Sequence, residues 1–144
     1  MRPPTRLCPG VWTGIAFLLL AGGCASGNGP LVPVHGKVSY QGISPHAGTI
    51  VFSPDPLRGA SGPIAVAVIE PDGTYALATG DQPGAAVGWY RVTVTANGAV
   101  SWERAEGGYQ SSQSFLPERY RDPDMSGLVR EVKDGDNLID FNLD

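Results

Sequence analysis

The side chains that most often perform catalysis or bind metals are few and scattered in this sequence. The chain has two histidines, His35 and His46, and neither lies at a spacing typical of zinc ligands. No G-x-S-x-G motif marks a nucleophilic serine, and no serine, histidine and acid follow one another in a known catalytic order. We therefore expect a protein that is not an enzyme and that needs no cofactor.

An oxygen-rich cluster near the end of the sequence is a candidate cation site. It contains Asp134, Asp136, Asn137 and Asp140, and oxygen is the ligand atom that calcium prefers. Counted from Asp134, the EF-hand pattern fails, because its fifth and sixth positions hold leucine and isoleucine instead of an oxygen ligand and a glycine. We expect a turn followed by an outward strand face, and no bound metal. Asp122 and Asp124 give a similar, weaker suggestion of a cation site.

Aromatic side chains indicate a different kind of site, a platform on which sugar rings stack. Residues 97–115 form a stretch without a clear period, rich in Gly, Ser and Gln, and long loops in compact domains are often functional. The candidate binding loop within it consists of Trp102, Tyr109 and Phe115, whose rings combine a large apolar area with, in two of them, a polar tip. Trp89 either joins this platform or packs on its own sheet, and packing is the simpler interpretation.

The first 23 residues have the features of a secretion signal. Arg2 and Arg6 give a positive start, and residues 11–21 form an apolar run. A membrane-spanning helix needs about 20 apolar residues, so this run is too short to remain as an anchor. Removal of residues 1–23 leaves eight basic and 14 acidic residues, a net charge of −6 compared with −4 for the whole chain. This charge argues against nucleic acid as a partner, since phosphates attract basic surfaces.

The sequence Ala21-Gly22-Gly23-Cys24 follows the apolar run directly. It resembles the lipobox of bacterial lipoproteins, in which the cysteine is lipidated and the chain is cleaved just before it. The resemblance implies that Cys24 becomes the acylated N-terminus and anchors the protein to a membrane. The motif departs from the usual pattern at Ala21, where leucine is commonest. Ala25 follows the cysteine, and by the same resemblance it favours the outer membrane of an envelope with two membranes.

The cysteine count agrees with a lipid anchor. Cys8 lies in the segment to be removed, so Cys24 is the only cysteine of the mature chain and no intramolecular disulfide can form. The alternative is an ordinary secreted protein with one free thiol. Several acyl chains would hold the protein stably at a membrane, because each buried methylene contributes about 0.8 kcal/mol. Residues 24–33 are then the lipidated cysteine and a flexible tether.

Residues 88–96 carry the strongest strand signal in the sequence. Tyr90, Val92, Val94 and Ala96 alternate with Trp89, Arg91, Thr93 and Thr95, a period of two built from β-branched and aromatic residues. Further strands are predicted at residues 34–40, 47–53, 64–70, 74–78, 128–132 and 137–143. The run 64–70 is apolar on both faces, so we expect it to be covered on both sides.

The spacing of these strands predicts the fold class. Turn signals such as Pro71-Asp72-Gly73 separate them, and no segment shows a helical period with caps. Residues 116–127 are polar and rich in turn formers. About seven short strands without helical crossovers predict an all-β domain over residues 34–144, an antiparallel β-sandwich with Greek-key connections.

A series of short motifs runs along residues 34–144. The motifs are Val34-His35-Gly36-Lys37-Val38, residues 47–54, Pro71-Asp72-Gly73-Thr74-Tyr75, Gly88-Trp89-Tyr90-Arg91-Val92, Leu116-Pro117-Glu118-Arg119-Tyr120, Ser126-Gly127-Leu128 and residues 137–143. This order resembles that of small bacterial lipoproteins with a transthyretin-like (prealbumin-like, or carboxypeptidase-regulatory-like) domain. The resemblance implies a seven-stranded sandwich with an accessory or structural role, and it offers no catalytic residues.

The expected function follows from the anchor and the fold together. We expect a lipid-anchored, non-enzymatic structural or interaction protein of the cell envelope. The alternative is a carbohydrate-binding module that uses the aromatic loop. The expected partners are the membrane, through the N-terminal lipid, and an envelope protein or a glycan.

Overall fold

The computed structural model describes residues 29–97 and 114–144 of the chain. In chain order its elements are β1 (Leu31–Val32), β2 (Val34–Tyr40), β3 (Ala47–Pro54), the 3-10 helix η1 (Pro56–Arg58), β4 (Ala65–Ile69), β5 (Thr74–Ala76), β6 (Ala78–Thr79), β7 (Gln82–Pro83), β8 (Ala85–Ala86), β9 (Gly88–Asn97), the 3-10 helix η2 (Glu118–Arg121), β10 (Val129–Val132), β11 (Asn137–Leu138) and β12 (Phe141–Leu143). The prediction of an all-β fold with almost no helix is confirmed. The strands are shorter and more numerous than predicted, because several predicted strands are split.

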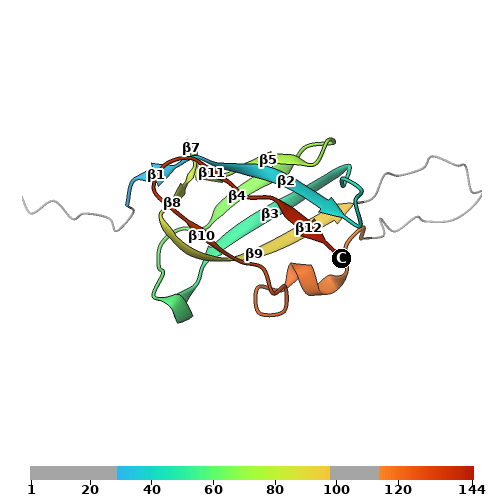
Figure 1. Ribbon diagram of the computed structural model, residues 1–144. Coiled ribbons are helices and arrows are strands. Elements are labelled where there is room, and N and C mark those ends of the chain that lie inside the picture. Colours follow the sequence, from blue (N-terminus) through green and yellow to red (C-terminus); the bar gives the residue numbers. More distant parts are fainter. Residues whose placement is uncertain (1–28, 98–113) are drawn as a thin grey trace, which may run out of the picture.

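The larger sheet is antiparallel and has six strands in the order β10-β9-β3-β4-β6-β7 (Figure 1). Strand β9 lies between β3 and β10, and its predicted alternation is confirmed: Val92 and Val94 are fully buried, whereas Thr95 is exposed. The register places Val94 opposite Ile50 and Val92 opposite Phe52, so the inward side chains of two long strands form one apolar layer.

A smaller sheet covers this apolar layer. In it β2 lies between β5 on one side and β11 and β12 on the other. The ring of Phe52 in the larger sheet lies 6.0 Å from that of Phe141 in β12 and 6.4 Å from that of Tyr75 in β5. These centroid distances are typical of packed aromatic pairs. The two sheets therefore face each other across one core, in a sandwich-like arrangement.

The closing strand differs from the prediction of an antiparallel sandwich. Strands β11 and β12 both run parallel to β2, with Asn137 opposite Val34 and Phe141 opposite Val38. The antiparallel prediction is wrong here because the chain does not return as a hairpin: it leaves β10 in the larger sheet and enters the smaller one at the edge of β2. Phe141 and Leu143 of β12 are buried, whereas Ile139, just before this strand, is only partly buried.

The parallel ladder is interrupted between β11 and β12, at Ile139 and Asp140. The Tyr75 hydroxyl donates to the Ile139 carbonyl at 2.7 Å, and the Lys37 amide donates to the Asp140 carboxylate at 2.8 Å. Burial raises the pKa of the Tyr75 phenol, and the Asp140 carboxylate raises that pKa further, so the hydroxyl keeps its proton as a donor. One carboxylate and one phenol thus satisfy backbone groups that a regular ladder would pair.

Two other predictions about strands are wrong. The stretch 64–70 is not covered on both sides, since Val68 is 66% exposed and Ile64 is 52% exposed. Their side chains favour a strand because they are β-branched, whether or not both faces are buried. The stretch 74–78 is not one strand, because the chain passes from the smaller to the larger sheet at the buried residue Leu77, between β5 and β6.

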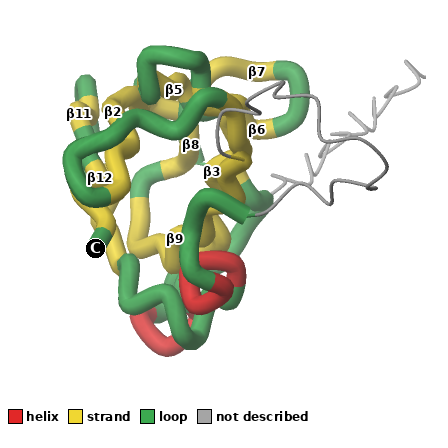
Figure 2. Tube along the Cα trace, turned by 90° about the vertical axis from the view of Figure 1, so that its right-hand side faces the viewer, coloured by secondary structure: helices red, strands yellow, loops and turns green. Residues whose placement is uncertain are grey.

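Two other segments also differ from their prediction, at the start of the domain and at residues 116–127. Leu31 and Val32 form β1, which pairs with β8, so the folded domain begins before the expected boundary at residue 34. The polar stretch 116–127 contributes Leu116 and Tyr120 to the core, each 3% exposed. Sequence pattern missed Tyr120 because one turn of η2 presents a single inward side chain, which leaves no period. Figure 2 shows both short helices on the side of the domain where β9 lies.

Candidate functional site

The loop between β3 and β4 begins with a buried carboxylate. Asp55 is only 3% exposed, and it precedes Pro56, the first residue of η1. Its Oδ1 accepts from the Leu57 amide at 3.1 Å, the usual role of an N-cap side chain. Gly59 ends the helical turn with φ of +74°, a conformation that favours glycine. Because η1 is capped at both ends, its last residue, Arg58, has a defined position.

Ion pairs connect Asp55 with η1 and β9 and, through Arg91, with the loop that contains Asp124. Arg91, on the outward face of β9, donates from Nε to Asp55 Oδ1 at 3.0 Å and also pairs with Asp124. Arg58 Nε lies 3.4 Å from the second oxygen of Asp55. The four side chains, which we call the Asp55 network, carry two positive and two negative charges. The buried charge of Asp55 is therefore compensated, as burial of a carboxylate requires.

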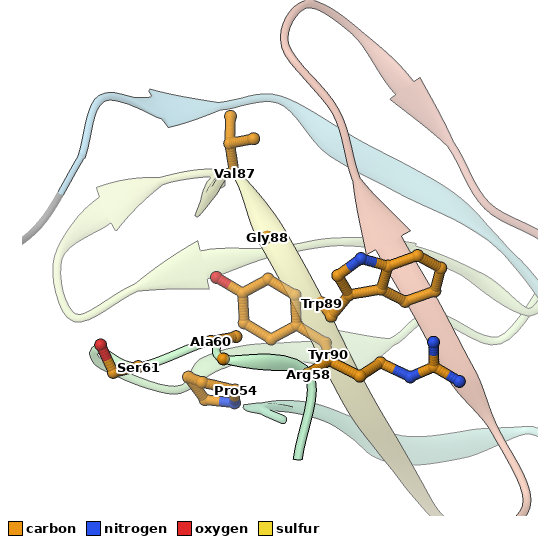
Figure 3. A pocket seen from close by; sticks show the side chains of 9 residues that line it. Pro54, Arg58, Ala60, Ser61, Val87, Gly88, Trp89 and Tyr90 are labelled. Carbon is orange, nitrogen blue, oxygen red and sulfur yellow. The ribbon is translucent and has the colours of Figure 1, made fainter. Parts of the chain in front are cut away.

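Beside the Asp55 network lies a hollow between the loop after β3 and the first residues of β9 (Figure 3). The guanidinium carbon of Arg58 is 4.5 Å from the centre of the Trp89 ring, which is a cation–π contact. The hollow has a volume of about 250 Å³ and is lined by Pro54, Arg58, Gly59, Ala60, Ser61, Val87, Gly88, Trp89 and Tyr90. We call it the Arg58–Trp89 hollow.

Two polar side chains of the hollow, Arg58 and Trp89, can only donate hydrogen bonds, whereas the hydroxyls of Ser61 and Tyr90 can both donate and accept. The Tyr90 hydroxyl donates to the Ala86 carbonyl at 2.8 Å, and burial raises its pKa. No Asp, Glu, Asn or Gln side chain lines the hollow. The charge that the hollow presents to a ligand is therefore that of Arg58.

Of the site residues predicted from the sequence, the structure describes only some. Cys24, Trp102 and Tyr109 lie outside the residues that the structure describes. Phe115 is described: its ring packs edge-on against Tyr40 at 5.5 Å, and its amide donates to the Ala96 carbonyl at 3.0 Å. Its position thus ties one end of the loop 97–115 to the core.

The acidic cluster near the C-terminus extends from the bend after β10 through the start of β11 to the interruption before β12. The Asn137 side chain accepts from the Lys133 amide at 2.9 Å and donates to the Lys133 carbonyl at 2.8 Å. Asp136 pairs with His35 Nδ1 at 3.4 Å. Within residues 29–97 and 114–144, no three His, Cys, Asp or Glu side chains gather closely enough to hold a metal ion.

Sequence reasoning missed the Asp55 network, although one signal for part of it was present. Asp55 precedes a proline, and Asp at the N-cap with Pro at the next position is a helix-start signal. The outward position of Arg91 was predicted correctly. Its partners were not, because Asp55 and Asp124 are 36 and 33 positions away in the sequence.

The Asp55 network makes a prediction for stability. Asp55→Ala should lower the free energy of unfolding by about 3 kcal/mol, because it leaves Arg91 partly buried without its nearest carboxylate and removes the cap of η1. Asp124→Ala should cost less than about 1 kcal/mol, since that side chain is 74% exposed. Urea unfolding of both variants measures the difference. Equal losses would contradict the central role of Asp55.

Among the described residues, no helix is both long and apolar enough to cross a bilayer. No protein-family model, curated protein or solved structure matches the chain.

Proposed function

We propose that this protein is a lipid-anchored, non-enzymatic interaction module of a bacterial cell envelope. The observation that carries the proposal is the sequence Ala21-Gly22-Gly23-Cys24 directly after a short apolar run. The position of β1 supports it, since the first described strand begins at Leu31, close behind Cys24. The six intervening residues extend at most about 20 Å, so an acylated Cys24 would keep the domain at the membrane surface.

We further propose that the domain is of the transthyretin-like type, with Greek-key connections. Two facing sheets around one core and the order of the motifs in residues 34–144 support this assignment. The parallel pairing of β11 and β12 with β2 is the feature in which this domain departs from a purely antiparallel sandwich. The proposed role is binding, because the described hollow offers donors and apolar surface but no nucleophile beside a general base.

The alternative function is carbohydrate binding through the aromatic loop. One structural observation favours it: Asn97 forms a β-bridge with Ser114, so the stretch that contains Trp102 and Tyr109 starts and ends at adjacent positions. A loop that is fixed at its base can vary in sequence and length without disturbing the sheet, because closure entropy grows only slowly with loop length. Recognition loops on a rigid scaffold have this arrangement.

The anchor predicts a specific modification. In a bacterium that expresses the full chain, the mature protein should begin at Cys24, carry a lipid and sediment with membranes. Cys24→Ser should abolish the lipid and release the protein from the membrane pellet, or leave the signal uncleaved. Mass spectrometry of the N-terminal peptide and fractionation measure both effects.

A matched control is provided by the other cysteine. Cys8→Ser changes a thiol in the segment to be removed, so lipidation and fractionation should stay as in the wild type. An unmodified mature chain that begins at another residue would contradict the proposed anchor.

A further inference from the structure

We propose that the Arg58–Trp89 hollow binds a sugar that carries a carboxylate, of the hexuronate type, as a residue of a polysaccharide. This inference builds on the proposed role of the domain as an interaction module, and it names the ligand class of one site. It does not depend on the lipid anchor or on the loop 97–115.

The position of Arg58 is the first argument. Asp55 contacts the guanidinium at Nε, the Trp89 ring lies under it at 4.5 Å, and about half of the Arg58 side chain remains exposed. The planar group is therefore held in place while part of it still faces solvent. A guanidinium can bind a second carboxylate through two parallel N–H···O bonds, and fixing it in advance lowers the entropic cost of binding.

The local charge permits an anion despite the acidic composition of the chain. Within the Asp55 network the charges of Asp55 and Asp124 are offset by those of Arg58 and Arg91. Arg58 is the charged member of this network that lines the hollow, whereas Asp55 is buried behind it. The lining of the hollow thus presents a cation and no acidic side chain to a ligand carboxylate.

Charge distinguishes an acidic sugar from a neutral one. Arg58 is the charged side chain that lines the hollow, and no Asp or Glu lines it. The ring hydroxyls of both kinds of sugar can pair with the hydroxyls of Ser61 and Tyr90. Only the acidic sugar adds a carboxylate, whose hydrogen bonds to a guanidinium are roughly twice as strong as those between neutral groups.

Size and apolar surface favour a single sugar ring. The volume of about 250 Å³ is below the range of roughly 300–1,000 Å³ that is typical of sites for drug-sized ligands. Pro54, Val87 and Trp89 line the hollow with apolar atoms, which a free inorganic anion would not use. The C–H face of a pyranose ring would cover them.

The test is a titration of the full-length chain in detergent. The chain has three tryptophans, so Trp12→Phe with Trp102→Phe leaves Trp89 as the only indole. At constant ionic strength, sodium galacturonate should change the Trp89 fluorescence in a saturable way. Glucose, which lacks the carboxylate, and acetate, which lacks the ring, should each bind at least about tenfold more weakly.

Substitutions at Arg58 locate the effect. Arg58→Gln should weaken galacturonate binding by about tenfold or more, and Arg58→Lys should give an intermediate loss, because lysine keeps the charge but not the paired donors. Arg121→Gln, a change at an exposed arginine of η2, should leave binding unchanged. Circular dichroism melting checks that each variant is folded, and Arg58→Lys keeps the test informative if Arg58→Gln does not fold.

Three outcomes of the sugar titrations would overturn the inference. They are binding of glucose as strong as that of galacturonate, unchanged binding in a folded Arg58→Lys or Arg58→Gln variant, and absence of saturable galacturonate binding. Stronger binding of a peptide with a free C-terminal carboxylate, such as N-acetyl-dialanine, would also overturn it, since the ligand would then be a peptide. Failure of lipidation at Cys24 would leave this titration unchanged, so the two proposals fail independently.

Discussion

A Val94→Asp substitution should leave the chain without a cooperative unfolding transition at 25 °C. Val94 is fully buried in β9, opposite Ile50 in the neighbouring strand and within the layer that faces the smaller sheet. A carboxylate there has no partner, and an unpaired buried charge costs several kcal/mol. The whole stability of a domain is only about 5–15 kcal/mol, so little or none of the native state should remain.

The neighbouring residue provides the control for this prediction. Thr95→Asp introduces the same side chain one position later, on the exposed face of the same strand. Its effect should be below about 1 kcal/mol. Thermal melts followed by circular dichroism should therefore show a transition for Thr95→Asp and none for Val94→Asp. A cooperative melt of Val94→Asp would mean that this position is not part of the core.

The success of the sequence in placing β9 has a physical cause. A half-buried strand alternates apolar and polar residues, so the order of residue types alone predicts the burial of Tyr90, Val92 and Val94. Turn chemistry is equally local. Gly73 has φ of +87°, and the Asp72 carboxylate accepts from the Thr74 amide at 2.9 Å, as the sequence Pro-Asp-Gly predicts. Interactions between near neighbours could therefore be predicted.

What the sequence did not reveal depends on contacts between distant segments. The direction of β12 is set by the edge of β2 that the chain reaches, which no local pattern encodes. The burial of Tyr120 follows from one turn of η2 packing beside β9. The Arg58–Trp89 hollow likewise needs the loop after β3 to fold over a strand about thirty positions later, so only its separate residues were visible.

Gly36 is a residue whose importance depends on a contact with a distant segment, at Ile139. In β2 it lies on the buried face together with Val34 and Val38, but alternation alone does not require glycine there. In the structure a Cβ at Gly36 would overlap the Ile139 carbonyl oxygen, and it would lie 2.6 Å from the Ile139 carbonyl carbon and 3.2 Å from Tyr75 Cε1. The closest neighbours are backbone atoms, which cannot rotate away as a side chain does.

Gly36→Ala should therefore lower the free energy of unfolding by about 3 kcal/mol. The added methyl group pushes against the carbonyl that accepts the Tyr75 hydroxyl, at the junction where β11 and β12 are interrupted. Urea unfolding measures the loss. Gly29→Ala is the control, since no atom lies within 4 Å of a Cβ built at that position, and it should change stability by less than about 0.5 kcal/mol.

A double substitution tests whether the loss acts through the Tyr75 hydrogen bond. Tyr75→Phe alone should cost about 1–2 kcal/mol, because the Ile139 carbonyl loses its donor. If Gly36→Ala already displaces that carbonyl, the two losses should sum to more than the loss of the double variant. Additive losses would show that the hydroxyl follows the carbonyl when the methyl group is added. A Gly36→Ala variant within 1 kcal/mol of the wild type would show that the interruption between β11 and β12 relaxes, and that the close approach of β2 to Ile139 is not required for folding.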